Sequence, residues 1–432
     1  MARQAACLRA VLRAVEAGVE LRKPADETLQ DYYRAHRELG SRDRRLISGT
    51  VYALWRWRGW CGPWQPRAPR ALIAAHVLEH PGQAAPEAIR WIVRDLWERQ
   101  WLESMLVFQG LEDRAAWVSN HWKFGAQIAD LVPSWVPNCL AVPVGESADR
   151  WLWRFIESIQ RRPPLWLRAI RCEGAELARR LQALGRDAVV PTGLSRAVRV
   201  NEHFPLAEIE RVLGPVYEVQ DVASQVVGEW CSPRPGERWW DMCAGAGGKA
   251  LDLAERVTEA GEVLATDLRP SALAEGKRRA RRAGFANIRW VGADTTTWNP
   301  GTLFDGVLVD APCAGLGMWG RSPDARWRTD LEDVLEAVRT QRALLDAAGR
   351  AVRPGGRLVY SVCSLTRLET DDVVDEFLAR HPEFVPEPGP DPFQSSIVES
   401  GRLFVWPWMG PGTGMFIARF RRSKTPGGAR SE

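Results

Sequence analysis

Short apolar segments alternate with segments of helical spacing from about residue 214 to residue 425. This alternation predicts an α/β domain with a mostly parallel, doubly wound sheet. In such a sheet the carboxyl ends of the strands open on one crevice, where ligands bind. The predicted strands are GERWWDMC, GEVLATDL, NIRWVGAD, FDGVLVDA, GGRLVYSVC and GMFIARF, and the helices between them include SALAEGKRRARRAG and LEDVLEAVRTQRALLDAAGRAV.

The rest of the chain divides into three further regions. Residues 1–145 have helical periodicity, as in the first predicted helix over residues 8–19, and are predicted to be all-helical. Residues 146–213 contain the predicted strands PPLWLRAIR and DAVVPTGL around a helix, GAELARRLQALG, which predicts a small α/β subdomain. The predicted α/β domain then spans 214–425, and residues 426–432 are predicted to be a disordered tail.

Composition narrows the class of protein. Apolar residues make up 45% and charged residues 26% of the 432-residue chain, which is typical of a soluble globular protein. No apolar stretch is long enough to span a bilayer, and the first residues lack the apolar core of a signal peptide. We therefore expect a cytoplasmic protein without membrane contact. We also expect it to act as a monomer. The eight cysteines form no C-x-x-C pair and have no zinc spacing with histidine, so no metal site is expected.

The segment DMCAGAGGKALDLAERV follows a predicted strand and opens a predicted helix. Its glycines Gly245, Gly247 and Gly248 allow a tight turn and the close approach of a ligand to the backbone. The segment is not a P-loop, because Cys243 and Ala250 replace required residues. Its glycine spacing alone is compatible with a dinucleotide site, and so with an oxidoreductase.

Acidic residues stand at the ends of three successive predicted strands: Asp241, Asp267 and Asp294. Together they suit an adenosine-bearing ligand with two ribose hydroxyls and an exocyclic amine. A ligand without a diphosphate, such as S-adenosylmethionine, tolerates these acids better than a dinucleotide does.

The next two predicted strands end in DAPC and YSVCS, which bring Asp310, Cys313 and Cys363 toward the same crevice. A thiolate is a strong nucleophile and can add to carbon 6 of a pyrimidine, which makes carbon 5 reactive toward a methyl sulfonium. Asp310 is suited to donate a proton or a hydrogen bond to ring nitrogen 3 of cytosine. A second cysteine near the first would assist release of the product, whereas a dinucleotide oxidoreductase has no use for the pair.

These motifs resemble those of the Sun/RsmB-type RNA 5-methylcytosine methyltransferases over roughly residues 150–422. The matching segments, in order, are GPVYEVQDVASQ, DMCAGAGGK, ATDL, GAD, DAPCAGLG, RSPDARW, YSVCSL and GTGMFIARFRR. The chain departs from the usual pattern at Ala246, Ala314, Val362 and Thr370, the last directly after Glu369. These departures leave the two cysteines and Asp310 intact.

The resemblance implies a Rossmann-like fold and S-adenosylmethionine as the methyl donor. It implies that Cys363 is the nucleophile, that Cys313 helps release the product and that Asp310 contacts both the cytosine and the donor. Lys249 would reach into the active site, and Arg321 would contact RNA. The cofactor would be held by a loop and three acids, namely Cys243, Ala244, Gly245, Ala246, Gly247, Gly248, Lys249, Asp267, Asp294 and Asp310.

The predicted partner is RNA. Only five of the 58 basic residues are lysines, and arginine suits contacts to phosphates and bases. The segment RDRRLISGTVYALWRWRG resembles part of a NusB-like RNA-binding domain, which favours small-subunit ribosomal RNA over transfer RNA. Two alternatives remain: methylation of transfer RNA, and a non-catalytic RNA-binding factor of ribosome assembly. The tryptophans near residues 55–64 are interpreted as core residues rather than as a base-stacking surface.

Overall fold

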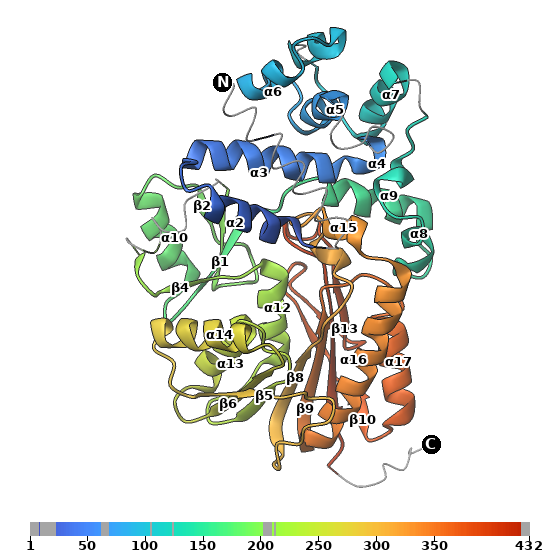
Figure 1. Cartoon of the computed structure of the whole chain (residues 1–432). Helices are drawn as coiled ribbons and strands as arrows, with labels where there is room; N and C mark the ends of the chain where they lie inside the picture. The colour runs from blue at the N-terminus through green and yellow to red at the C-terminus, as the bar shows by residue number, and fades with distance from the viewer. Residues whose placement is uncertain are drawn as a thin grey trace. The chain divides into compact units, whose positions relative to one another are not determined.

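The computed structural model describes residues 8, 23–61, 69–103, 106–122, 125–201, 210 and 213–424. The chain forms two compact units (Figure 1). The helical unit comprises Met1–Arg161 and Trp319–Asp330, and the α/β unit comprises Arg162–Met318 and Leu331–Glu432. The predicted tail, 426–432, and most of the predicted first helix, 8–19, lie outside the described residues. No helix within the described ranges is long and apolar enough to cross a membrane.

The described elements of the helical unit are all helices. Its core contains Trp55, Trp57 and Trp60, which are at most 5% exposed, so the interpretation of these tryptophans as core residues is confirmed. Trp64 lies outside the described residues. The helices are α2 (Ala25–Ala35), α3 (Ser41–Arg56), α4 (Arg58–Cys61), α5 (Pro69–Glu79), α6 (Glu87–Ile92), η1 (Trp97–Glu103), α7 (Leu111–Trp122), η2 (Ile128–Leu131), α8 (Val136–Cys139), α9 (Ala148–Ile159) and α15 (Ala325–Arg328).

The segment Trp319–Asp330 is an integral part of the helical unit, although it follows the cysteine-bearing loop of the α/β unit in sequence. Arg326 is fully buried there and donates a hydrogen bond to the carbonyl oxygen of Leu131 at 2.7 Å. The side chain of Asp324 accepts from the backbone N–H of Ala25 at 3.0 Å. Burial and the neighbouring Arg56 lower the pKa of Arg326 to about 9. The helical unit therefore depends on a segment from the second half of the chain.

The α/β unit begins with a small antiparallel sheet in the order β2-β3-β1-β4. Its strands are β1 (Leu165–Ala169), β2 (Ala188–Val189), β3 (Ala197–Val200) and β4 (Tyr217–Val219), and helix α10 (Gly174–Ala183) follows β1. The predicted strands and helix of this region are present, and β3 and β4 are additional.

The main sheet has the order β10-β14-β9-β8-β5-β6-β7, with β13 also paired to β14. The pairs β5–β6, β6–β7, β5–β8 and β8–β9 are parallel, and β14 is antiparallel to β9. This confirms the predicted Rossmann-like sheet. The strands are β5 (Arg238–Asp241), β6 (Glu262–Asp267), β7 (Ile288–Gly292), β8 (Phe304–Asp310), β9 (Val352–Val362), β10 (Phe384–Pro386), β13 (Arg402–Val405) and β14 (Met415–Arg422), and a separate hairpin pairs β11 (Gly389–Asp391) with β12 (Ser396–Val398).

Helices cover both faces of this sheet, as its buried strands require. One face packs on α12 (Val222–Cys231) and α13 (Gly248–Val257), and the other packs on α16 (Leu331–Ala351) and α17 (Asp371–Arg380). Helix α14 (Pro270–Ala283) connects β6 to β7 (Figure 1). The strand order reverses between β5 and β8, so the sheet's ligand crevice is expected there.

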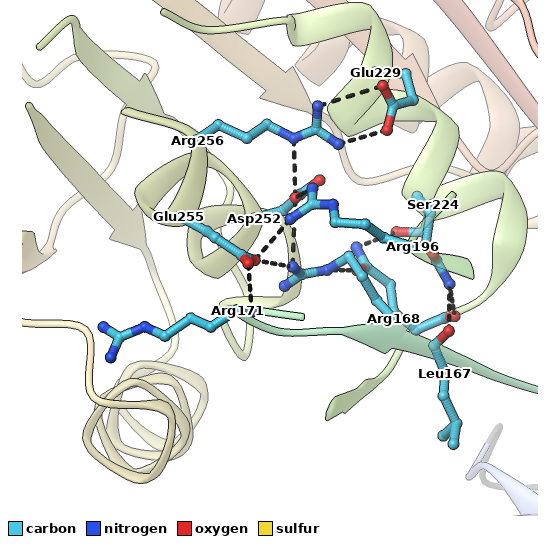
Figure 2. Close-up of polar contacts among 11 residues, drawn as sticks. Leu167, Arg168, Arg171, Arg196, Ser224, Glu229, Asp252, Glu255 and Arg256 are labelled. Carbon is cyan, nitrogen blue, oxygen red and sulfur yellow. Dashed lines mark hydrogen bonds and ion pairs between the residues drawn. The ribbon is translucent and has the colours of Figure 1, made fainter. Parts of the chain in front are cut away.

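A buried ionic cluster, defined by Asp252, Glu255, Arg168, Arg196 and Arg256, joins the small sheet to helix α13 (Figure 2). Arg168 on β1 lies 2.8 Å from Glu255 and 3.4 Å from Asp252, and Arg196 pairs with both acids. Burial of Asp252 opposes its charge, but the three guanidinium groups outweigh this effect and lower its pKa. The cluster holds the small sheet against the helix that begins at the glycine-rich loop.

Candidate active site

The loop from Cys243 to Lys249 connects β5 to α13 and is built around glycines in left-handed conformations. Gly245 has φ +54° and Gly247 has φ +83°, which residues with a side chain rarely adopt. A Cβ atom on Gly247 would lie 2.6 Å from the ring of Trp290. The sequence therefore needs glycine here for two reasons, the turn and the close packing behind it.

Asp267, at the end of β6, fixes this loop. Its Oδ2 accepts a hydrogen bond from the backbone N–H of Gly245 at 2.8 Å, and Arg269 pairs with the same carboxylate. Burial opposes the charge of Asp267, but the hydrogen bonds from Arg269 and Gly245 outweigh this effect and lower its pKa. Asp294, after β7, is exposed and accepts hydrogen bonds from Thr296.

Asp241 lies at the start of the same loop and is fully buried. Neither of its carboxyl oxygens has a hydrogen-bond partner among the described residues. Burial and the neighbouring Asp310 raise the pKa of Asp241 to about 7, although Lys249 acts in the opposite direction. Burial raises the pKa of the Cys243 thiol, and the charges of Asp241, Asp310 and Asp267 raise it further. A fully buried acid thus stands at the end of β5, directly before the glycine-rich loop.

Asp310 and Lys249 form the polar centre of the site. Lys249 Nζ donates to Asp310 Oδ2 at 2.7 Å, and Ser361 Oγ donates to Asp310 Oδ1 at 2.7 Å. Ser361 is the register partner of Asp310 on the adjacent strand β9. Burial disfavours the charged form of Lys249, but Asp310 and Asp241 outweigh this effect and raise its pKa. The two charges therefore stabilise each other at the carboxyl end of β8.

The two cysteines meet beside this pair. Cys313 follows β8 and Cys363 follows β9, and their Sγ atoms are 3.2 Å apart. The backbone N–H of Gly317 donates to the carbonyl oxygen of Cys363 at 3.0 Å, which links the two loops directly. The Cys363 thiol and burial raise the pKa of Cys313. Cys363 also contributes to the raised pKa of Lys249, so the thiols and the charged pair share one environment.

The structure thus brings together most of the residues selected from the sequence, but not all of them. Arg321 lies in the segment Trp319–Asp330, which belongs to the helical unit. Asp294 points to its own turn rather than to the other acids.

Sequence reasoning missed Ser361 and Arg279. Arg279 on α14 donates to the carbonyl oxygen of Ala246 at 2.8 Å and pairs with the buried Glu218. Ser361 could have been found because it stands two residues before Cys363 in the motif YSVCS. Arg279 could not, because it lies in a basic run that is typical of a solvated helix face. Among the described residues, no group of three or more His, Cys, Asp or Glu side chains is arranged to hold a metal ion.

The strand order, the glycine-rich loop and the acids after β5 and β6 define a Rossmann-like methyltransferase fold. The family model described as 16S rRNA methyltransferase RsmB/F matches residues 229–421. The ribosomal RNA small subunit methyltransferase B of Thermus thermophilus is 33% identical over 371 residues, which cover 81% of this chain and 84% of the relative. The chain therefore belongs to the RsmB/F family.

Other relatives match over a shorter span. Two Xylella fastidiosa proteins, also named ribosomal RNA small subunit methyltransferase B, are 34% and 35% identical, and the chain spans 66% and 59% of their lengths. The crystal structure of PH0851 has a TM-score of 0.73 at 23% identity and covers 96% of this chain and 98% of that one. A methyltransferase homologue from Pyrococcus horikoshii has a TM-score of 0.55 at 25% identity, over 64% of this chain and 96% of the homologue.

Proposed function

We propose that this protein transfers a methyl group from S-adenosylmethionine to carbon 5 of a cytosine in small-subunit ribosomal RNA. The observation that carries the proposal is the pair of thiols, 3.2 Å apart, beside the Lys249–Asp310 ion pair. This pair lies at the carboxyl end of a methyltransferase sheet, and family membership supports the same reaction. The reaction would take place in the cytoplasm, with the protein acting as a monomer.

The residues around the glycine-rich loop fit S-adenosylmethionine. Gly245 in the loop Cys243–Lys249 has φ +54°, and a Cβ atom there would come into van der Waals contact with the guanidinium group of Arg269 at 3.6 Å, so glycine keeps the backbone of this turn accessible to a ligand. The buried carboxyl group of Asp241 favours a positive charge nearby, and the carboxylates of Asp267 and Asp294 suit hydroxyl and amine groups. When bound, the cofactor supplies an electrophilic methyl group. The acids at the ends of β5 and β6, Asp241 and Asp267, disfavour a diphosphate, which argues against a dinucleotide.

In the proposed reaction the Cys363 thiolate adds to carbon 6 of the flipped cytosine, and the electron pair of the 5,6 double bond moves toward ring nitrogen 3. Asp310 binds this edge of the base, and the ammonium group of Lys249 supplies the hydrogen bond that stabilises the added charge. Carbon 5 would then take the methyl group, whose bond to the donor sulfur would break and leave its electron pair on that sulfur. A base removes the proton from carbon 5, the double bond re-forms and the thiolate leaves.

Cys313 is proposed to assist the last step, since its Sγ lies within contact of the leaving sulfur. The Cys363 thiol and burial raise the pKa of Cys313, which favours its protonated form. Such a thiol is suited to move a proton next to the departing Cys363. Arg321 is proposed to contact RNA, and residues 1–145 are proposed to form a NusB-like RNA-binding domain.

The test compares two cysteine variants in transfer of radiolabelled methyl groups to purified 16S rRNA and to transfer RNA. Cys363→Ala is expected to abolish transfer while leaving S-adenosylhomocysteine affinity unchanged. Cys313→Ala is expected to accumulate a protein–RNA adduct that survives denaturation, because attack proceeds and release does not. Retained turnover in Cys363→Ala would remove the nucleophile assignment, and labelling of transfer RNA alone would correct the substrate.

Bisulfite sequencing of ribosomal RNA from cells with and without the gene identifies the modified cytosine. A cytosine that is protected from conversion only in the presence of the gene supports the proposal. An identical pattern in both strains would contradict it.

A further inference from the structure

A buried glutamate, Glu369, lies between the two cysteine-bearing loops and binds both. It follows strand β9 and precedes helix α17, and its side chain is fully buried. No role has been given to it so far. Its carboxyl group accepts four hydrogen bonds, two on each oxygen.

The first carboxyl oxygen holds the loop of Cys313. Oε1 accepts from the backbone N–H of Ala314 at 2.7 Å and from Gln341 Nε2 at 3.2 Å. The same amide nitrogen of Gln341 donates to the carbonyl oxygen of Pro312 at 2.9 Å. Residues on both sides of Cys313 are therefore fixed by one carboxyl–amide pair, and Gln341 is itself fully buried.

The second carboxyl oxygen holds the loop of Cys363. Oε2 accepts from the hydroxyl of Ser364, the residue directly after Cys363, and from Thr366 Oγ1 at 2.9 Å. Both hydroxyl side chains are fully buried. The backbone carbonyl of Glu369 also accepts from the hydroxyl of Tyr360 on β9, at 2.7 Å. Glu369 is thus anchored to the strand that delivers the nucleophile.

A buried carboxyl group is costly to retain unless its oxygens are satisfied, and here four donors satisfy them. Two of these donors come from residues adjacent in sequence to the two cysteines, Ala314 and Ser364. Loss of the carboxyl would leave Ala314 N–H without its acceptor and would release the turn after Cys363. Because Glu369 binds the residue directly after each cysteine, it restrains the distance between the Sγ atoms of Cys313 and Cys363.

We propose that Glu369 is a positioning residue that sets the separation of the Cys313 and Cys363 thiols. Its catalytic meaning rests on the proposed function: with the separation fixed, the thiol that attacks carbon 6 and the thiol that assists release act on the same base. The separation itself is a property of the protein alone and can be measured without RNA.

The probe is phenylarsine oxide, an arsenical that bridges two neighbouring thiols. Both thiols lose their protons to the arsenical oxygen, two sulfur–arsenic bonds form and one water is released, with no change of oxidation state. In the wild type, mass spectrometry of peptides should find Cys313 and Cys363 bridged. Glu369→Gln keeps the size of the side chain and is expected to slow bridging about tenfold, the change expected when one hydrogen bond to a charged group is lost.

Two further variants control this measurement. Glu376→Gln removes an acid of helix α17 that pairs with Arg342 at 2.6 Å, and it should leave the bridging rate unchanged. Ser364→Ala removes one of the two hydroxyl donors on the Cys363 side, leaves Thr366 in place and should slow bridging less than Glu369→Gln does. If Glu369→Gln does not fold, as judged by circular dichroism and S-adenosylhomocysteine binding, Ser364→Ala decides the question.

Methyl transfer gives the second measurement. Glu369→Gln should lower kcat about tenfold while KM for RNA and the Kd for S-adenosylhomocysteine stay within twofold of the wild type. A folded Glu369→Gln protein that bridges at the wild-type rate would overturn the proposal, as would unchanged bridging in Ser364→Ala if only that variant folds. If the wild type bridges its thiols but transfers no methyl group to any RNA, the proposed function fails and the assignment of Glu369 to thiol spacing stands.

Discussion

The ionic cluster around Asp252 offers a test of what holds the small sheet to the glycine-loop helix. The perturbation is Asp252→Asn, which keeps the shape of the side chain and removes its charge. Asp252 is 1% exposed and contacts Arg168, Arg196 and Arg256, which are 1%, 18% and 18% exposed. The variant therefore leaves three largely buried guanidinium groups with one fewer acid.

The size of the effect follows from the partners that remain. Breaking a buried ion pair by removing one partner costs about 3–5 kcal/mol. In the variant, Arg168 and Arg196 each keep an ion pair with Glu255 at 2.8 Å, and Arg256 keeps one with Glu229 at 2.6 Å. We therefore expect a cost at the lower end of this energy range. We expect a loss of about 3 kcal/mol in the free energy of unfolding, or roughly 6–12 °C in the melting temperature of a unit this large.

The assay is thermal and urea unfolding followed by circular dichroism. The pKa of Asp252 is lowered in the folded state from its ordinary value of 3.8. Its contribution to stability is therefore present above pH 3.8 and is lost as the pH falls through the lower, folded-state value. The difference between the wild type and Asp252→Asn should accordingly be the same at pH 5 and pH 8.

The matched control is Asp375→Asn, which removes an acid that is 66% exposed and pairs with Arg402. An exposed pair of this kind contributes about 0–1 kcal/mol. Equal melting temperatures for Asp252→Asn and Asp375→Asn would refute the reasoning, as would a difference that grows between pH 5 and pH 8.

Two further predictions concern the acids around the glycine-rich loop. Asp241, with its pKa raised to about 7, contributes stability that is present below pH 3.8 and lost as the pH rises through about 7. Asp241→Asn should therefore gain stability relative to the wild type between pH 5 and pH 8, as measured by urea unfolding; no change in their difference over this range would contradict it. Asp267→Ala should weaken S-adenosylhomocysteine binding about tenfold or more, because it removes a charged acceptor and the hydrogen bond that holds Gly245. Calorimetric titration checks this, with Asp375→Asn expected to bind as the wild type does, and an unchanged affinity in Asp267→Ala would exclude the role of this acid.

The main sheet could be predicted because its strands are apolar and its helices are amphipathic. The strands β5, β6, β7, β8, β9 and β14 all lie within the predicted segments or overlap them. The strands that were not predicted, among them β3, β4 and β10–β13, are three or four residues long. Such short segments carry too little pattern to be distinguished from loops.

The segment Trp319–Asp330 could not be assigned to the helical unit from sequence. Arg326 reads as a surface residue, yet it is fully buried and donates to a backbone carbonyl oxygen. The partners of such a donor are set by tertiary structure, and no spacing along the chain encodes them. The domain boundaries at residues 145 and 213 also rest on sequence patterns alone, and they remain predictions.

The part of the site that could be predicted consists of residues at or just after the ends of strands. Asp310, Cys313 and Cys363 follow two adjacent parallel strands, and the sheet topology brings them together. In the sequence, Glu369 is only a landmark of the family pattern, because its importance lies in hydrogen bonds to two separate loops. Polar networks of this kind depend on which donors converge, and a linear pattern does not contain that information.

The split origin of the helical unit has a consequence for synthesis on the ribosome. Trp319 is fully buried in that unit, where its ring lies 6.1 Å from Trp135 and 6.2 Å from Phe155. Domains at the start of a chain commonly fold while the remainder is still being translated. Here the nascent amino-terminal helices must wait for residues 319–330 to emerge before their interior is complete, so this unit cannot finish folding until most of the α/β unit has also been translated.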